Sequence, residues 1–263
     1  MESIRNEKTV REQYKTAANL QTRISIHAKY SVNKQGFGNW IFEQYNMKEN
    51  DRILELGCGD GSMWKTHAIP TGASLLLTDF SEGMLDSAKA NVPADKRITF
   101  GRVDIQNIPY PDDTFDIVIA NMMLYHVPDL HKGLAEVKRV LKPGGQFCCA
   151  TYGEHGITEY VQDLLADYGV KREGNKAFTL QNGADILGTH FDTVEKRLYE
   201  DRLEVTETGD LVDYVLSLTG MADFGSIVPR DGTAEDLFRI LDAQKKNGII
   251  TVPKEYGMFI AQK

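Results

Sequence analysis

Cysteine and long apolar runs are scarce in this sequence, and positive charge is outnumbered by negative charge. Its 263 residues contain three cysteines, Cys58, Cys148 and Cys149, which form neither a CxxC pair nor a Cys/His ligand spacing. This pattern argues against a disulfide framework and against a structural zinc. The N-terminus lacks a hydrophobic signal core, and no apolar run is long enough to span a bilayer. We therefore predict a cytoplasmic protein with no metal site and no membrane association.

Acidic residues outnumber basic ones, 38 against 30, which gives a formal net charge of −8. An acidic chain repels phosphate backbones, so nucleic acid is not the partner we expect. The length and the 41% hydrophobic content suffice for one large α/β domain, or for one domain with an appended lid. The sequence leaves the oligomeric state open.

Short apolar segments alternate with helical segments between residues 52 and 152. We predict strands over residues 52–57, 74–79, 97–101, 115–121 and 146–151, and helices over residues 61–69, 81–92 and 130–141. Ser81 is typical of a helix N-cap, with Glu82 in the first turn. Near-continuous apolar strands that alternate with helices indicate a parallel sheet covered on both faces.

The flanking segments are predicted to cover this sheet. Residues 1–45 have a helical pattern and form an N-terminal cap in our interpretation, and residues 46–263 form the main domain. Within that domain, two insertions at about residues 153–190 and 208–250 are predicted as helical lids. Further strands are expected at residues 194–205 and 257–263.

Three glycines follow the first predicted strand directly, at Gly57, Gly59 and Gly61. Bare backbone at this place lets a ligand approach the strand end, where N–H groups can hold its polar atoms. Asp79 closes the next strand, and a carboxylate there can accept both ribose hydroxyls of an adenosine. Because the spacing is GxGxG instead of GxGxxG, and Glu55 is acidic, a cofactor without phosphates is favoured. A sulfonium with an amino-acid tail meets this requirement.

The ordered motifs resemble those of the class I S-adenosylmethionine-dependent methyltransferases, in the ubiquinone/menaquinone biosynthesis (methyltransferase type 11) branch. They cover about residues 45–152 and read ILELGCGDG, LLLTDFSEGML, VDIQNIPYPDDTFDIVIANMMLYHVPD and LKPGG. The resemblance implies an α/β, Rossmann-like fold with a seven-stranded, mostly parallel sheet. The implied strand order is 3-2-1-4-5-7-6 with the last strand antiparallel, and the implied cofactor is S-adenosyl-L-methionine.

The same resemblance assigns ten residues to the cofactor site. They are Glu55, Gly57, Cys58, Gly59 and Asn121 at the amino-acid tail, Asp79 at the ribose, Phe80 and Met84 against the adenosine, and Asp104 and Ile105 at the adenine. For Asp104, a solvated turn acid is the alternative interpretation. We expect Cys58 to pack beside the cofactor without being reactive.

Candidate catalytic residues follow the fourth predicted strand, where the transferable methyl group is expected. His126 can act as a general base near neutral pH, or it can pack structurally and bond to backbone. Tyr125 can orient the acceptor, or it can fill the pocket wall. In the predicted cap, Tyr14 and Tyr30 are our candidates for closing over the acceptor, against the alternative of ordinary packing.

The acceptor is predicted to be a small molecule with an oxygen, nitrogen or carbon nucleophile. The segment after the fourth strand begins Asn121-Met-Met-Leu and lacks the Asn/Asp-Pro-Pro-Tyr/Phe motif of enzymes that methylate amino groups of DNA bases and glutamine. Methylation of RNA or protein, and a non-catalytic S-adenosylmethionine-binding module, are the alternatives. A nucleotide-dependent oxidoreductase is disfavoured by GxGxG and LKPGG.

Overall fold

The computed structural model describes residues 17–172, 174–218 and 234–263. Contacts between Cα atoms divide the chain into two compact units. The first unit comprises residues 1–36, 152–176 and 199–256, and the second comprises residues 37–151, 177–198 and 257–263. The predicted roles of residues 1–45 as a cap and of the two insertions as lids stay predictions.

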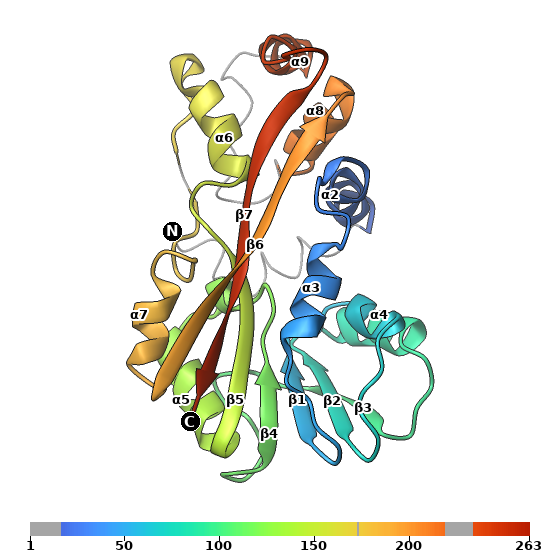
Figure 1. Cartoon of the computed structure of the whole chain (residues 1–263), viewed down its shortest axis with the longest axis vertical. Helices are drawn as coiled ribbons and strands as arrows, with labels where there is room; N and C mark the ends of the chain where they lie inside the picture. The colour runs from blue at the N-terminus through green and yellow to red at the C-terminus, as the bar shows by residue number, and fades with distance from the viewer. Residues whose placement is uncertain (1–16, 173, 219–233) are drawn as a thin grey trace. The chain divides into compact units, whose positions relative to one another are not determined.

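A seven-stranded sheet has the order β3-β2-β1-β4-β5-β7-β6 (Figure 1). Its strands are β1 (Arg52–Leu56), β2 (Ser74–Asp79), β3 (Ile98–Arg102), β4 (Phe115–Ile119), β5 (Leu141–Tyr152), β6 (Thr193–Val205) and β7 (Ile250–Gln262). The pairs among β1 to β5 are parallel, whereas β7 runs in the opposite direction. The predicted Rossmann-like topology, with its strand order and reversed last strand, is therefore confirmed.

The central strands are apolar on both faces, as a covered parallel sheet requires. Residues 53–56 of β1 are all buried, and Asp116 is the one residue of β4 that is not. Alternate residues belong to different hydrophobic clusters: Leu54 and Val118 lie in one, and Ile53 and Ile117 in another. Each face of these strands thus contributes its side chains to a separate hydrophobic cluster.

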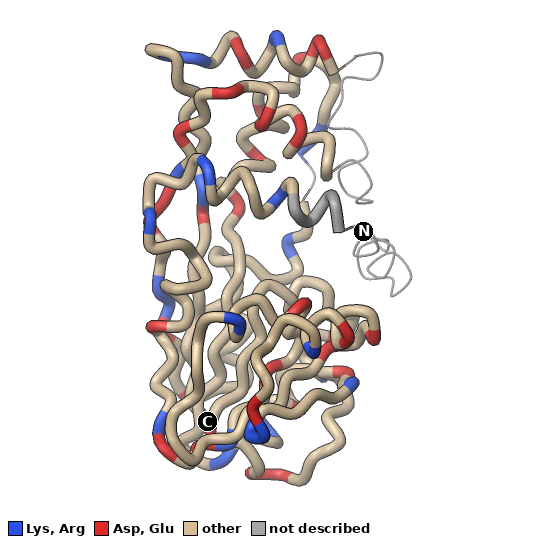
Figure 2. The backbone as a smooth tube through the Cα atoms, turned by 90° about the vertical axis from the view of Figure 1, so that its right-hand side faces the viewer, with Lys and Arg blue, Asp and Glu red and all other residues tan. Residues whose placement is uncertain are grey.

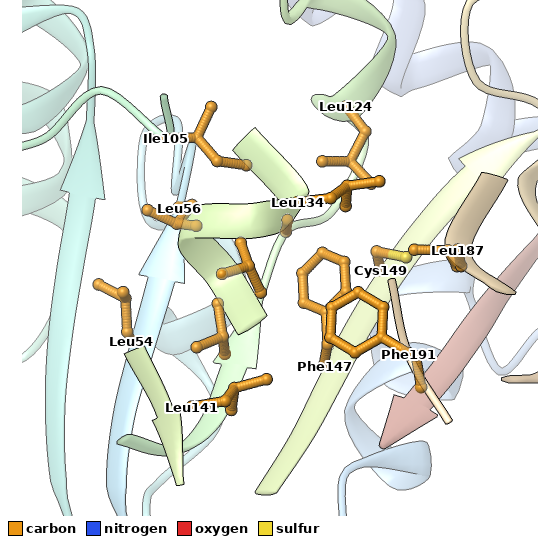
Figure 3. Packing of buried hydrophobic residues seen from close by; sticks show 14 of the residues in the cluster. Leu54, Leu56, Ile105, Leu124, Leu134, Leu141, Phe147, Cys149, Leu187 and Phe191 are labelled. Carbon is orange, nitrogen blue, oxygen red and sulfur yellow. The ribbon is translucent and has the colours of Figure 1, made fainter. Parts of the chain in front are cut away.

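One of these clusters is shown in Figure 3. Leu54 and Leu56 of β1 lie in it with Phe147 of β5, whose ring stacks on that of Phe191 at 5.5 Å between centroids. Ile105, which follows β3, belongs to the same cluster and is 5% exposed. Buried side chains therefore pack next to the carboxyl ends of β1 and β3.

The helices fall into two groups by unit. The second unit contains α3 (Phe37–Gln44), α4 (Glu82–Asn91), α5 (Leu130–Val140), α7 (Gly183–Gly188) and the 3₁₀ turns η1 (Ser62–Lys65) and η2 (Leu124–His126). The first unit contains α2 (Ala17–Tyr30), α6 (Ile157–Leu164), η3 (Ala166–Tyr168), α8 (Thr208–Ser217) and α9 (Ala234–Asp242). Among the described residues, no helix is long and apolar enough to cross a membrane.

Most predicted elements are present, with changes at their ends. Ser81 caps α4 as predicted, because its side chain accepts a hydrogen bond from the backbone N–H of Met84. The predicted helix over residues 61–69 is only the short turn η1, since Thr66 leaves helical geometry and the Trp64 side chain is buried. The last strand begins at Ile250, before the predicted residue 257.

The first unit has its own hydrophobic core and a buried ion pair. Ile26 of α2 packs with residues of α6, α8 and α9, including Val161, Leu211 and Leu237. Lys254 is paired with Asp201, and their side chains are 4% and 0% exposed. Because an isolated buried charge is costly, each of these two groups depends on the other.

Candidate active site at the carboxyl ends of the sheet

The strand order reverses between β1 and β4, and ligands of open α/β sheets bind at this switch point. In the register of the sheet, Glu55 pairs with Ile119 of β4, and Leu56 pairs with Thr78 of β2. The residues that follow β1, β2 and β4 therefore leave the sheet side by side. The described part of the chain contains no group of three or more His, Cys, Asp or Glu side chains placed to hold a metal ion.

The glycine bend after β1 consists of Gly57, Gly59 and Gly61, and all three have left-handed backbone conformations. Their φ angles are +69°, +57° and +69°, values that residues with a side chain rarely adopt. A Cβ atom on Gly57 would lie 2.9 Å from Cγ of Met123, and one on Gly61 would lie 2.7 Å from Cγ2 of Val92. A Cβ atom on Gly59 would meet nothing within 4 Å. Of the three, Gly59 is thus the one that borders open space.

Asp79 at the end of β2 braces this bend. Its carboxylate accepts hydrogen bonds from the backbone N–H groups of Gly59, at 3.0 Å, and Ser81, at 2.8 Å. The N–H of Cys58 donates to the carbonyl of Thr78 at 2.8 Å. Burial raises the pKa of Asp79, while the backbone hydrogen bonds lower it. Since a carboxylate has about four acceptor positions, Asp79 can accept further hydrogen bonds from a ligand.

Glu55 is a buried acid directly below the glycine bend. Its carboxylate accepts a hydrogen bond from the indole Nε1 of Trp64. Burial raises the pKa of Glu55 to about 7, and the negative charge of Asp79 adds to this effect, whereas Trp64 and the Asn121 amide oppose it. Across the described residues, Glu55 has no lysine, arginine or histidine as an ion-pair partner.

Asn121 follows β4 and faces the same region. Its Nδ2 donates a hydrogen bond of 2.6 Å to the hydroxyl oxygen of Tyr45, just beyond α3. Its Oδ1 is buried without a hydrogen-bond partner. An unsatisfied buried acceptor of this kind normally calls for a donor from a ligand or water. The amide therefore offers an acceptor to a donor-rich group.

His126 and Tyr125 lie in the η2 turn. Their ring centroids are 4.5 Å apart, and Tyr125 packs partly against the cluster of Figure 3. Nδ1 of His126 is buried without a hydrogen-bond partner, and burial lowers the pKa of the imidazole to about 4. The ring is consequently neutral at pH 7 and a weak base. Both predicted roles of His126 stay predictions.

The residues predicted for the adenosine lie at the ends of β2 and β3. Phe80 is 36% exposed, with the guanidinium of Arg102 5.0 Å from its ring centroid. Met84 is half-buried in the first turn of α4. The Asp104 carboxylate accepts from the backbone N–H of Gln106 at 2.8 Å, which is the geometry of a turn acid. Its predicted role at the adenine stays a prediction.

Two residues, Tyr14 and Tyr30, were predicted to close over the acceptor. Tyr14 lies outside the described residues. Tyr30 belongs to the first unit, where its hydroxyl donates to the Asp210 carboxylate. Their predicted contact with an acceptor stays a prediction.

Three residues of the site had no predicted role. Tyr45 and Trp64 hold the side chains of Asn121 and Glu55, and Met123 fills the space above Gly57. The sequence did contain a signal for Tyr45 and Trp64, because buried tyrosine and tryptophan normally place their polar atom against a hydrogen-bond partner. The identity of those partners depends on the fold.

Comparison with known proteins shows which family this part of the chain resembles. Residues 54–149 match the family model described as a methyltransferase domain. Over these residues the chain is similar to that family. The predicted resemblance to class I methyltransferases is thereby confirmed for this part of the chain, which contains most of β1, all of β2 to β4, the glycine bend and most of β5.

Curated relatives are similar to this chain over part of their length. A demethylmenaquinone methyltransferase of Clavibacter sepedonicus is 41% identical over 36% of this chain and 39% of its own. A 27-O-demethylrifamycin SV methyltransferase of Amycolatopsis mediterranei is 32% identical over 64% of this chain and 59% of its own. The chain thus spans less than two thirds of the length of these relatives.

Solved structures share the fold at low identity. Phosphoethanolamine N-methyltransferase 2 of Haemonchus contortus, in complex with S-adenosyl-L-methionine, gives a TM-score of 0.57 at 19% identity, with 94% of this chain and 57% of that chain covered. Protein YcgJ of Bacillus subtilis gives 0.53 at 14% identity over 86% and 97%. These likenesses show that the chain shares its fold with those proteins.

Proposed function

We propose that this protein is an S-adenosylmethionine-dependent methyltransferase that acts on a small molecule. The observation that carries the proposal is the left-handed glycine bend, where Gly59 borders open space and donates its N–H to Asp79. Bare backbone and a carboxylate with free acceptor positions are what an adenosyl ligand needs at this place.

The residues present fit S-adenosylmethionine in charge and hydrogen bonding. Ribose hydroxyls are donors, and Asp79 can accept from them. The ammonium of the amino-acid tail is a cation with three donors, and Glu55 and Oδ1 of Asn121 are buried acceptors. Phe80 offers an exposed ring for the adenosine, with Met84, Asp104 and Ile105 as the further predicted contacts.

When bound, this cofactor supplies a methyl group activated on a sulfonium sulfur. The task of the chain is then to hold the acceptor in line with that group and to exclude water. The turn with Tyr125 and His126 is our proposed place for the acceptor. Because His126 is a weak base, it suits an acceptor that reacts without the loss of a tightly held proton.

A small-molecule acceptor is supported by charge and by relatives. Figure 2 shows acidic residues interspersed with Lys and Arg along the backbone, and the net charge is −8. This distribution is unfavourable for binding a phosphate backbone. The relatives named above act on demethylmenaquinone and demethylrifamycin, according to their names. We also propose a cytoplasmic location, in keeping with three free cysteines.

The first experiment separates the cofactor from its competitors. Calorimetry should give a binding isotherm with S-adenosylhomocysteine and none with NAD. Tight NAD binding without S-adenosylhomocysteine binding would overturn the proposal. Incubation with methyl-labelled cofactor and fractionated small-molecule extracts then tests turnover. Label found only in RNA or protein would support the alternative acceptors, and binding without any transfer would indicate a non-catalytic module.

A further inference from the structure

The second unit places three hydrogen-bond acceptors around the glycine bend, on Glu55, Asp79 and Asn121. Glu55 is 4% exposed, Asp79 is half-buried, and Oδ1 of Asn121 has no partner. The hydrogen bonds that reach the two acids come from neutral groups: the Trp64 indole and the Asn121 amide at Glu55, and backbone N–H groups at Asp79. Among the described residues, neither acid forms an ion pair with a lysine, arginine or histidine. Two carboxylates in one buried region therefore disfavour the doubly ionised state.

A proton is the simplest cation that relieves the repulsion between the two carboxylates. With a proton on Glu55, the acid group is neutral, and Trp64 can still donate to its second oxygen. A ligand ammonium relieves it equally well, because it brings one positive charge and three donors. The proton and the ammonium therefore compete for the same place.

We propose that Glu55 carries a proton while the site is free of ligand and releases it when a ligand ammonium takes position beside Glu55 and Asn121. This inference rests on the proposed function, because the ammonium that replaces the proton belongs to the proposed cofactor. The O–H bond of the carboxylic acid breaks heterolytically, the proton passes to buffer, and the ammonium keeps its own charge. Cofactor binding is then coupled to pH through one residue.

The groups around Glu55 allow this assignment. Burial raises the pKa values of the Tyr45 hydroxyl and of the Cys58 and Cys148 thiols, so these groups stay neutral in the same range. Asp79 is the other acid that acts on Glu55, whereas Asp60 acts on the Cys58 thiol. Since the pKa of Glu55 is about 7, about half of the free protein carries the proton at pH 7.

Calorimetry in buffers of different ionisation enthalpy measures the released protons directly. With S-adenosylhomocysteine, we expect about one proton released per site at pH 5.5, about half at pH 7 and almost none at pH 8.5. Methylthioadenosine, which has the adenosine but no ammonium, should bind more weakly and release none. The Glu55→Gln variant should bind S-adenosylhomocysteine with no release, and Asp60→Asn should behave as wild type.

The outcomes distinguish this inference from the proposed function. Binding of S-adenosylhomocysteine without proton release, or unchanged release in Glu55→Gln, would overturn the inference and leave the methyltransferase assignment intact. No binding of S-adenosylhomocysteine would overturn both. If Asp79→Asn alone abolished the release, the proton would reside on Asp79 and the assignment to Glu55 would be wrong.

A ligand-free measurement supplies a second readout that also reports on folding. Trp64 donates to Glu55, so its fluorescence should change as Glu55 titrates. In a Trp40→Phe background, which leaves Trp64 as the sole tryptophan, we expect a transition near pH 7. The transition should vanish on adding Glu55→Gln. A flat profile in the parent, or an unaltered one in Glu55→Gln, would contradict the inference.

Discussion

Replacing Gly59 by alanine adds one methyl group at the point where the glycine bend borders open space. The chain offers a matched control in Gly144, at the start of β5 and therefore at the opposite edge of the sheet. Both residues have left-handed conformations, with φ of +57° and +76°, and a Cβ atom on either would meet nothing within 4 Å. The two variants thus share their backbone strain and differ in what lies beside them.

The expected effect on stability follows from the backbone. An alanine in the left-handed region costs roughly 1–2 kcal/mol. The reduced freedom of the unfolded chain offsets roughly 0.4–1 kcal/mol of this. Both variants should therefore lose about 1 kcal/mol of unfolding free energy. Gly61→Ala should lose about 2–4 kcal/mol, because its methyl group would also lie 2.7 Å from Val92.

Binding should separate the two variants where stability does not. If the amino-acid tail of the ligand occupies the space beside Gly59, overpacking should weaken S-adenosylhomocysteine binding by about 1–3 kcal/mol, or roughly 5- to 150-fold. Gly144→Ala should bind like wild type. Urea unfolding gives the stabilities and calorimetry the affinities. A folded Gly59→Ala protein that binds within twofold of wild type would refute the placement of the ligand at this bend.

Three further changes test other parts of the structure. Asp79→Ala should weaken S-adenosylhomocysteine binding by about 1–3 kcal/mol in calorimetry, because charge-assisted hydrogen bonds to ribose are lost; unchanged affinity in a folded variant would place the ribose elsewhere. The pKa of His126 is lowered from 6.5 to about 4 by burial, so its contribution to stability is present above pH 6.5 and is lost as pH falls toward 4. Between pH 7 and pH 5, the unfolding free energy measured with denaturant should fall by about 2 kcal/mol less in His126→Asn than in wild type. An equal fall in both proteins would contradict the assigned burial. Lys254→Met should destabilise the protein by about 3–5 kcal/mol, because it leaves Asp201 charged and buried, and the double variant with Asp201→Leu should recover much of this loss in thermal unfolding.

Local patterns were sufficient to predict most of the sheet. Apolar runs such as residues 52–57 and 74–79, punctuated by glycine or by the Ser81 cap, indicate strands and helix starts without knowledge of their neighbours. Strand order came from the family resemblance, and the structure confirms it. The bend at Gly57 to Gly61 was also visible, since only glycine suits three left-handed residues in so short a segment.

Contacts between distant residues could not be predicted in this way. Nothing in the local sequence indicates that Trp64 donates to Glu55 or that Asn121 donates to Tyr45. The low pKa of His126 likewise depends on burial, which the fold decides. The helix expected over residues 61–69 was wrong in length for a related reason, because burial of Trp64 overrides the local helical pattern.

The contact between Met123 and Gly57 has a consequence for how this scaffold can diversify. It joins the loop proposed to face the acceptor to the loop proposed to hold the cofactor. Tyr125 and His126 of this loop are only half-buried and can be exchanged to admit a new acceptor. Position 123 must keep a slender, unbranched side chain that fits over bare backbone, and Leu124 is part of the core. A library built on this loop should therefore vary residues 125 and 126 and retain Met123 and Leu124.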